Sequence, residues 1–462
     1  MDVTALSNFE KNAMANLNDK TNFICGRNPF AVHNAPTMSV PEQESADLWI
    51  SENTINQERS CSPNAASCCV NSCDLVDYTL DSDLPSYNGV VIENSTSVLI
   101  QPKITLSGCG CSDFTCKGTG LLAEHNAKVD VRNGTIITHG ATRPATIATS
   151  GSTLKLFHTH LATYGGPLPE DYVPTVGLGF MEPPAPLGLS GTCRTHLSMD
   201  NSETFFYDCS VYAEAWGALS TDSAAGYVYL EANRSTVTVK GNGYCTYADK
   251  ACHVTLNDCN LSSGNLFGIQ DGNSSIRFLH TIGICSGSGF LLHGGMHDLE
   301  DIGTLRLDAC DLTSGGPMFR CKSSNADIYA KNCKLASSSG TILETMFTDD
   351  PYYVSKRSHC DNEYGVQVTF EAMSLVGDFV CADPERPVKL NLIDASVMGA
   401  ITGYPTLRLS GNSVFTATKD SEIVLVGDCL NKIDAISGVT ISVKGSGVPT
   451  DFPSGGSLLY TD

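Results

Sequence analysis

The chain has 462 residues and a formal net charge of −22, with 28 basic and 50 acidic residues. Its basic residues form no cluster, so neither a nucleic acid nor an anionic membrane surface is expected as a partner. No apolar run approaches the roughly 20 residues that span a bilayer.

Residues 1–85 read as an irregular N-terminal segment that includes a cap for the first coil of a repeat. Met1–Lys20 is polar and lacks the apolar stretch of a secretory signal, which predicts a cytoplasmic protein with reduced thiols. The 20 cysteines favour the alternative, a secreted protein with disulfides. Their spacing matches no common zinc motif, so no cofactor is expected, and a structural metal is an alternative without support from the sequence.

Residues 86–462 are predicted to form an all-β, right-handed parallel β-helix solenoid. Short alternating strands are separated by turns rich in Gly, Asn and Ser, and no stretch of the repeat has a helical apolar period. One unit recurs around aligned cysteines, in Phe206–Val211, Leu256–Leu261, Leu307–Leu312 and Ala330–Leu335. We expect these cysteines to stack inside the coils as small buried residues.

Two insertions interrupt the predicted coils. Residues 165–188 hold six prolines, which fix the backbone and cannot join a strand ladder. Residues 348–364 are rich in Tyr and Asp. Both are predicted to be loops that overhang a groove on the side of the solenoid.

Aromatic residues gather between positions 207 and 247, with carboxylates among them. Tyrosine and tryptophan beside carboxylates suit stacking on sugar or phenolic rings, although the same residues also favour strands for packing reasons. The predicted ligand-binding residues are Trp216, Asp222, Tyr227, Tyr229, Tyr244 and Gln270.

The strands after the cysteine column can be aligned on one apolar residue each: Leu219, Ile269, Leu291, Phe319 and Leu343. This alignment predicts a row of charged residues just after them. Neighbouring coils lie about 4.8 Å apart, which places Asp271 beside His293, with Arg320 and Glu344 one and two coils further. A carboxylate next to an imidazole is a competent acid/base pair, and a guanidinium can stabilise an anion. These four residues are the predicted catalytic set, and a solvated turn column is the structural alternative.

The coil pattern resembles the pectate-lyase-like β-helix superfamily over roughly residues 90–450. Members of that superfamily include polysaccharide lyases, isomerases and glycoside hydrolases, so the resemblance implies a site on the outer face of the stacked strands. The motif of no specific member is present. We therefore expect a cofactor-independent enzyme acting on a carbohydrate or other hydroxyl-rich or phenolic ligand. The alternative is a non-catalytic, glycan-binding or adhesin-like β-helix. A homo-oligomer is compatible with a solenoid, but no residue points to one.

Overall fold

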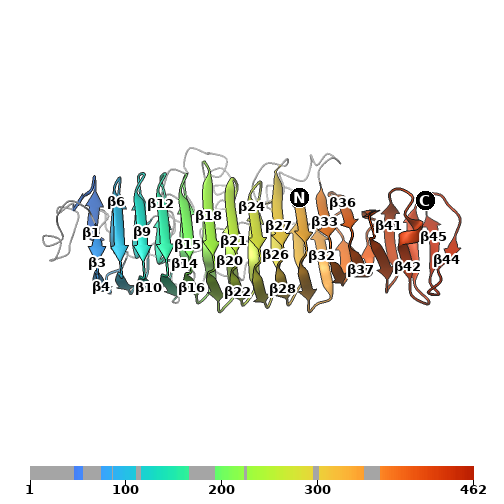
Figure 1. Cartoon of the computed structure of the whole chain (residues 1–462), viewed down its shortest axis with the longest axis horizontal. Coiled ribbons are helices and arrows are strands. Elements are labelled where there is room, and N and C mark those ends of the chain that lie inside the picture. Colours follow the sequence, from blue (N-terminus) through green and yellow to red (C-terminus); the bar gives the residue numbers. More distant parts are fainter. Residues whose placement is uncertain are drawn as a thin grey trace, which may run out of the picture. The chain divides into compact units, whose positions relative to one another are not determined.

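The structure is a computed structural model that describes residues 46–55, 74–85, 87–110, 116–165, 193–222, 226–294, 301–347 and 365–461. These residues form two compact units, unit 1 ending at Gly264 and unit 2 running from Asn265 to Asp462. Each unit is a parallel β-helix, which confirms the predicted fold class (Figure 1). Within the described part of the chain, the one helical element is the 3-10 turn η6 (Leu430–Lys432), and no helix there is long and apolar enough to cross a membrane.

Each coil of unit 1 contributes one strand to each of three sheets, which we name A, B and C in chain order, and sheet A has one additional strand, Thr54–Ile55, that pairs antiparallel with Ala46–Ser51. Sheet A holds β1 (Ala46–Ser51), β2 (Thr54–Ile55), β5 (Asn88–Glu93), β8 (Leu121–Glu124), β11 (Thr146–Ala148), β14 (Cys193–Met199), β17 (Trp216–Asp222) and β20 (Gly243–Ala248). Sheet B holds β3 (Leu75–Val76), β6 (Thr96–Ile100), β9 (Lys128–Arg132), β12 (Thr153–Phe157), β15 (Glu203–Tyr207), β18 (Val228–Asn233) and β21 (Cys252–Asn257). Sheet C holds β4 (Thr79–Ser82), β7 (Lys103–Leu106), β10 (Thr135–His139), β13 (His160–Tyr164), β16 (Ser210–Ala213), β19 (Thr236–Val239) and β22 (Asn260–Ser263).

Unit 2 follows the same plan. Its sheet A holds β23 (Leu266–Asp271), β26 (Phe290–His293), β29 (Phe319–Lys322), β32 (Thr341–Met346), β35 (Asp378–Cys381) and β38 (Ile401–Thr402). Its sheet B holds β24 (Ser275–Leu279), β27 (Ile302–Asp308), β30 (Asn325–Lys331), β33 (Val366–Glu371), β36 (Val388–Ile393), β39 (Thr406–Ser410), β41 (Ser421–Leu425), β43 (Thr440–Lys444), β44 (Thr450–Asp451) and β45 (Ser457–Thr461). Its third side holds β25 (Ile282–Cys285), β28 (Asp311–Ser314) and β31 (Lys334–Ser337), and a separate sheet of β34 (Ser374–Val376), β37 (Ser396–Gly399), β40 (Val414–Ala417) and β42 (Ile433–Ala435).

The stack of unit 1 begins before the predicted boundary at residue 86. Strand β1 already pairs in parallel with β5, and β3 and β4 pair in parallel with β6 and β7. The greater part of the predicted cap, and both predicted insertions apart from residue 165, lie outside the described residues.

The bend between sheets B and C explains the cysteine column. A residue with a positive φ, such as Asp208 (55°) or Asp258 (52°), turns the chain, and the next side chain points inward. Cys209 and Cys259 occupy that inward position, 3% and 1% exposed, and each thiol donates to backbone carbonyls at 3.3–3.4 Å. Ser235 takes the same place in the coil between them and donates to the Asn233 carbonyl at 2.9 Å. The cysteines therefore stack as small buried residues, as predicted.

Sheet A of unit 1 is buried on both faces, unlike sheets B and C. In β8, β11 and β14 the described side chains are buried almost throughout, whereas β9 and β12 alternate between buried and accessible positions. A buried apolar row runs over the outer side of sheet A and includes Trp49, Val91, Leu122, Ile147 and Leu197, which are in register with one another.

Candidate functional site

The outer side of sheet B in unit 1 is an accessible strand face that includes two of the predicted ligand-binding residues, Tyr227 and Tyr229. Alternation turns every second side chain of β9, β12, β15, β18 and β21 outward, because the residues between them are buried. We call these outward residues the sheet B face: Lys128, Asp130, Arg132, Thr153, Lys155, Phe157, Glu203, Phe205, Tyr207, Tyr229, Glu231, Asn233, His253, Thr255 and Asn257. The register arranges them in three rows that cross the strands.

Aromatic rings form the apolar part of this face. Phe157 and Tyr207 stack across neighbouring coils, with centroids 5.0 Å apart and planes 11° apart. Phe205 and Tyr229 meet in a tilted arrangement at 5.8 Å. Since stacked rings cover each other's faces, Phe157 and Tyr207 offer solvent mainly their edges and the Tyr207 hydroxyl. The result is a ridge that combines apolar edges with hydroxyl groups.

A hydrogen-bonded chain of polar groups runs beside these rings. Tyr229 Oη donates to Glu231 Oε2 at 2.6 Å, and Asn233 Nδ2 donates to Glu231 Oε1 at 2.8 Å. Asn257 Nδ2 in turn donates to Asn233 Oδ1 at 3.3 Å. Burial, followed by the neighbouring Glu231, raises the pKa of Tyr229 to about 12, so its hydroxyl keeps its proton at neutral pH. The chain holds these polar groups in fixed orientations.

Tyr227 extends this face at the start of β18. Its side chain is 49% exposed and lies parallel to Tyr229 at 6.4 Å, with His253 at 4.9 Å on the next coil. Burial lowers the pKa of His253, so its imidazole is neutral at physiological pH. Two of the predicted ligand-binding residues, Tyr227 and Tyr229, are therefore accessible on one surface.

Trp216 and Tyr244 lie instead on sheet A of unit 1 and are 5% and 1% exposed. Their rings meet edge to face at 5.9 Å, and the Arg194 guanidinium is 5.7 Å from the Trp216 centroid. Tyr244 lies over Gly217, where a Cβ atom would come within 2.5 Å of its hydroxyl oxygen. Asp222 ends β17 and is half-buried. The structure thus places these three predicted residues on a different sheet from Tyr227 and Tyr229.

Asp271 and His293 are neighbours in unit 2, at the ends of β23 and β26. Asp271 Oδ1 lies 3.5 Å from His293 Nδ1, so the adjacency that the alignment predicted is present. Gly268 faces the interior, where a Cβ would meet Phe290 and Ile276, and alternation from Gly268 turns Asp271 outward. Both side chains are nevertheless buried, with residue exposures of 6% and 1%. Their catalytic role stays a prediction.

The alignment is off by one residue at the next coil. Arg320 pairs with Leu291, and Lys322 is the residue beside His293. Arg320 and Glu344 are direct neighbours, as predicted, and form an ion pair with Nε 2.6 Å from Oε2. The error arose because Leu291 was aligned with Phe319, whereas Phe319 pairs with Phe290 and stacks on it inside the coil.

Gln270 points into the interior of unit 2. Its Nε2 donates to the Gly272 carbonyl at 2.6 Å and to Ser274 Oγ at 3.0 Å, and the residue is 1% exposed. Gly303 lies against it, and a Cβ there would come within 1.7 Å of Gln270 Oε1. This inward position corrects the prediction that Gln270 belongs to an outer binding surface.

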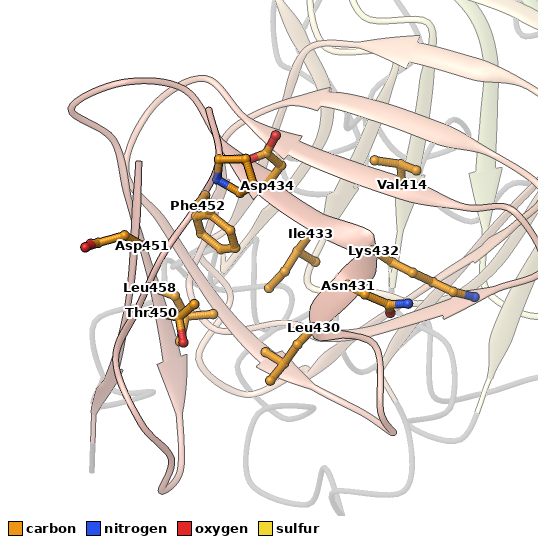
Figure 2. A pocket seen from close by; sticks show the side chains of 11 residues that line it. Val414, Leu430, Asn431, Lys432, Ile433, Asp434, Thr450, Asp451, Phe452 and Leu458 are labelled. Carbon is orange, nitrogen blue, oxygen red and sulfur yellow. The ribbon is translucent and has the colours of Figure 1, made fainter. Parts of the chain in front are cut away.

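A pocket of about 480 Å³ lies near the end of unit 2, away from every predicted site residue (Figure 2). Leu430, Ile433, Phe452 and Leu458 supply apolar walls, as Figure 2 shows. Two of its charged groups make local hydrogen bonds: Lys432 Nζ donates to the Gly411 carbonyl at 2.7 Å, and Asp434 Oδ1 accepts from the Ala435 N–H at 2.8 Å. We find no convergent set of reactive groups there.

Sequence reasoning missed Phe157 and Phe205 as members of the accessible face. Phe157-His158-Thr159 has the same place in its coil as Tyr207-Asp208-Cys209, directly before the residue with positive φ. The position directly before the bend residue was the signal in the sequence that could have identified Phe157 as an outward residue. No protein-family model matches the chain, and no curated protein is significantly similar to it in sequence.

Proposed function

We propose that this protein is a carbohydrate-binding, adhesin-like β-helix in which the sheet B face of unit 1 holds an extended glycan. We also propose that the chain belongs to the pectate-lyase-like superfamily, on the basis of its three-strand coils. A glycan-binding role favours the secreted alternative over the cytoplasmic one.

The observation that carries the proposal is the repetition of the face itself. Each coil presents outward residues at equivalent positions, and successive coils are about 4.8 Å apart. An extended β-linked polysaccharide also repeats its hydroxyl groups along a line, with one pyranose ring per repeat. A chain lying along the stacking direction would therefore meet similar groups, coil after coil. The ring edges and the Tyr207 hydroxyl suit the mixed apolar and polar surface of a sugar.

The charges of the face favour a neutral glycan. Its basic side chains, Lys128, Arg132 and Lys155, are matched in number by three acidic ones, Asp130, Glu203 and Glu231. The whole chain carries a net charge of −22, which disfavours strongly anionic polymers. Glycans with hydroxyl groups but without sulfate or uronate groups are the expected class.

An acid/base enzyme is the second candidate, because Asp271 and His293 do lie side by side. A catalytic hydrogen bond is often long before substrate binds, so 3.5 Å is compatible with a general-base pair. The candidate ranks second because a base must reach its substrate, and His293 is 1% exposed. It predicts that His293→Ala abolishes turnover of a glycan with little change in melting temperature. A fully active His293→Ala protein would remove this candidate.

The test of binding is a screen of neutral and anionic oligosaccharides, followed by calorimetric titration of the best ligand. Tyr207→Ala and Glu231→Gln should each weaken binding at least tenfold, which corresponds to about 1.4 kcal/mol. Tyr164→Ala is the matched control, because Tyr164 is a half-buried ring that stacks on His139 on the outer side of sheet C. Equal losses in all three variants, or none in the first two, would refute the sheet B face as the binding surface.

A further inference from the structure

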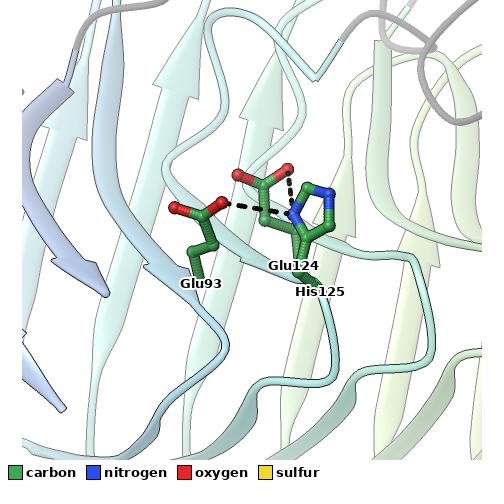
Figure 3. A group of neighbouring side chains, drawn as sticks. All are labelled: Glu93, Glu124 and His125. Atoms are coloured by element: carbon green, nitrogen blue, oxygen red, sulfur yellow. Dashed lines mark ion pairs between the residues drawn. The ribbon is translucent and has the colours of Figure 1, made fainter. Parts of the chain in front are cut away.

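Three side chains of types that can ligate a metal, Glu93, Glu124 and His125, converge where β5 and β8 of sheet A end in unit 1 (Figure 3). We propose that they form a Zn²⁺ site that joins two successive coils and leaves one coordination position open. The inference is independent of the proposed glycan-binding face, since it concerns other residues on another sheet.

Strand register brings the two carboxylates together. Glu93 ends β5 and pairs with Glu124 at the end of β8. Both follow an outward-facing residue of sheet A, Val91 or Leu122, at a spacing of two, so both carboxylates point outward. His125 comes next with a φ of 52°, and its Nδ1 faces both carboxylates, as Figure 3 shows.

The distances match the edges of a tetrahedral metal site. His125 Nδ1 lies 3.6 Å from Glu93 Oε1 and 3.7 Å from Glu124 Oε2. Zinc takes nitrogen and oxygen ligands at about 2.0–2.2 Å in tetrahedral geometry, which places two ligand atoms about 3.4 Å apart. An octahedral ion with ligands at about 2.1 Å would need adjacent ligand atoms about 3.0 Å apart. The observed separations are closer to the tetrahedral arrangement.

A partly buried hydrogen bond orients the first of these carboxylates. Trp49 Nε1 donates to Glu93 Oε2 at 3.0 Å, which leaves Oε1 as the oxygen that faces His125. Trp49 is fully buried, so its indole is a fixed donor. Metal-binding carboxylates are commonly held by such a partner on the oxygen remote from the metal. This contact lies outside the group of three ligands and supports it independently.

The donor set and the burial favour zinc over a harder cation. An imidazole suits zinc and neighbouring transition metals, whereas calcium and magnesium are bound by oxygen ligands. The Glu124 side chain is 9% exposed and that of Glu93 is 23% exposed, so their negative charges are poorly screened by water. The His125 side chain is 56% exposed, which leaves the solvent side for a water molecule or an exogenous ligand.

Fluorescence gives a readout at the site, because Trp49 and Trp216 are the two tryptophans of the chain. The full chain with Trp216→Phe, stripped with a chelator, is titrated with Co²⁺ and, in parallel, with Zn²⁺ by calorimetry. Co²⁺ at the site should quench Trp49 and give the visible absorption of a tetrahedral ion, with saturation at one equivalent. Zn²⁺ should compete for the same equivalent.

The ligand variants are His125→Asn, which keeps a residue that tolerates a positive φ, and Glu124→Gln, which keeps the side-chain shape. Each should weaken Co²⁺ binding at the quenching site at least tenfold, while exposed His139→Asn leaves it unchanged. If both variants quench like the parent, or if the parent does not quench, the proposal is wrong. It is equally wrong if the bound cobalt shows thiolate charge-transfer absorption, because cysteines would then hold the metal.

Discussion

Acid should destabilise unit 1 through a histidine in its interior. His196 is fully buried, and both ring nitrogens meet hydroxyls: Nδ1 is 2.9 Å from Thr146 Oγ1 and Nε2 is 2.8 Å from Ser198 Oγ. Its ring meets Phe206 edge to face at 5.1 Å. Burial lowers the pKa of His196 from 6.5 to about 3, because no carboxylate compensates the loss of water around the imidazolium.

The pKa shift fixes the sign and size of the effect. Between about pH 6.5 and pH 3 the unfolded chain binds a proton at this site and the folded chain does not, so stability falls as the pH is lowered. The stabilisation is complete above about pH 6.5. At roughly pH 4.5 the loss from this one group is about 3 kcal/mol, and it approaches about 5 kcal/mol near pH 3.

Urea unfolding of wild type and His196→Gln at about pH 7 and pH 4.5 isolates the contribution of His196 to the free energy of unfolding. Other titrating groups contribute equally to both proteins. The wild type should lose about 3 kcal/mol more than the variant between the two pH values. Leu154→Ala controls for destabilisation alone, since it empties a fully buried position without removing a titratable group. If His196→Gln has the same pH dependence as the wild type, the reasoning fails.

Three further predictions concern the architecture. Arg143 is fully buried and donates to four backbone carbonyls, among them those of Ser107 at 2.6 Å and Tyr87 at 2.7 Å. Arg143→Met should therefore lower the free energy of unfolding in urea by about 3 kcal/mol or more. A loss below about 1 kcal/mol would show that these hydrogen bonds do not stabilise the fold. Burial raises the pKa of Cys259 to about 11, so its thiol should resist alkylation near pH 8 in the native protein and react after denaturation, as peptide mapping would show. Phe290, 1% exposed among other rings, should cost about 3–5 kcal/mol when replaced by Ala, whereas Tyr227→Ala should change stability by about 0.5 kcal/mol or less.

The β-helix could be predicted from the sequence because sheets B and C alternate clearly. Strands such as Thr153–Phe157 have one buried and one accessible side, so polar and apolar residues alternate with the period of a strand. The cysteine column added a fixed point in several coils, since the bend admits a small inward side chain there. These two signals were sufficient for the fold class.

The charged row could not be placed reliably because sheet A lacks that alternation near it. Leu291 is outward and Leu292 inward, yet both are buried and apolar, so the sequence does not distinguish the two sides of β26. A shift of one residue therefore went undetected: the alignment places Cys321 opposite His293, whereas Lys322 lies there in the structure. The same ambiguity hid the inward direction of Gln270.

The proposed metal site could not be predicted from the sequence for a different reason. Glu124 and His125 are adjacent in sequence, but their partner Glu93 lies a full coil earlier and is brought near only by strand register. No local motif marks such a set. A repeat alignment that includes the first coils would have been needed to find it.

The measurement that tests the central claim most directly is calorimetric titration of the best oligosaccharide from the screen into wild type and a Phe205→Ala, Tyr207→Ala double variant. Both residues are outward and half-buried on β15, so their loss should leave the coil folded. The account predicts that the double variant binds at least a hundredfold more weakly, with an unchanged circular dichroism spectrum. Equal affinity for the two proteins would show that the glycan binds elsewhere and that the sheet B face is not the functional surface.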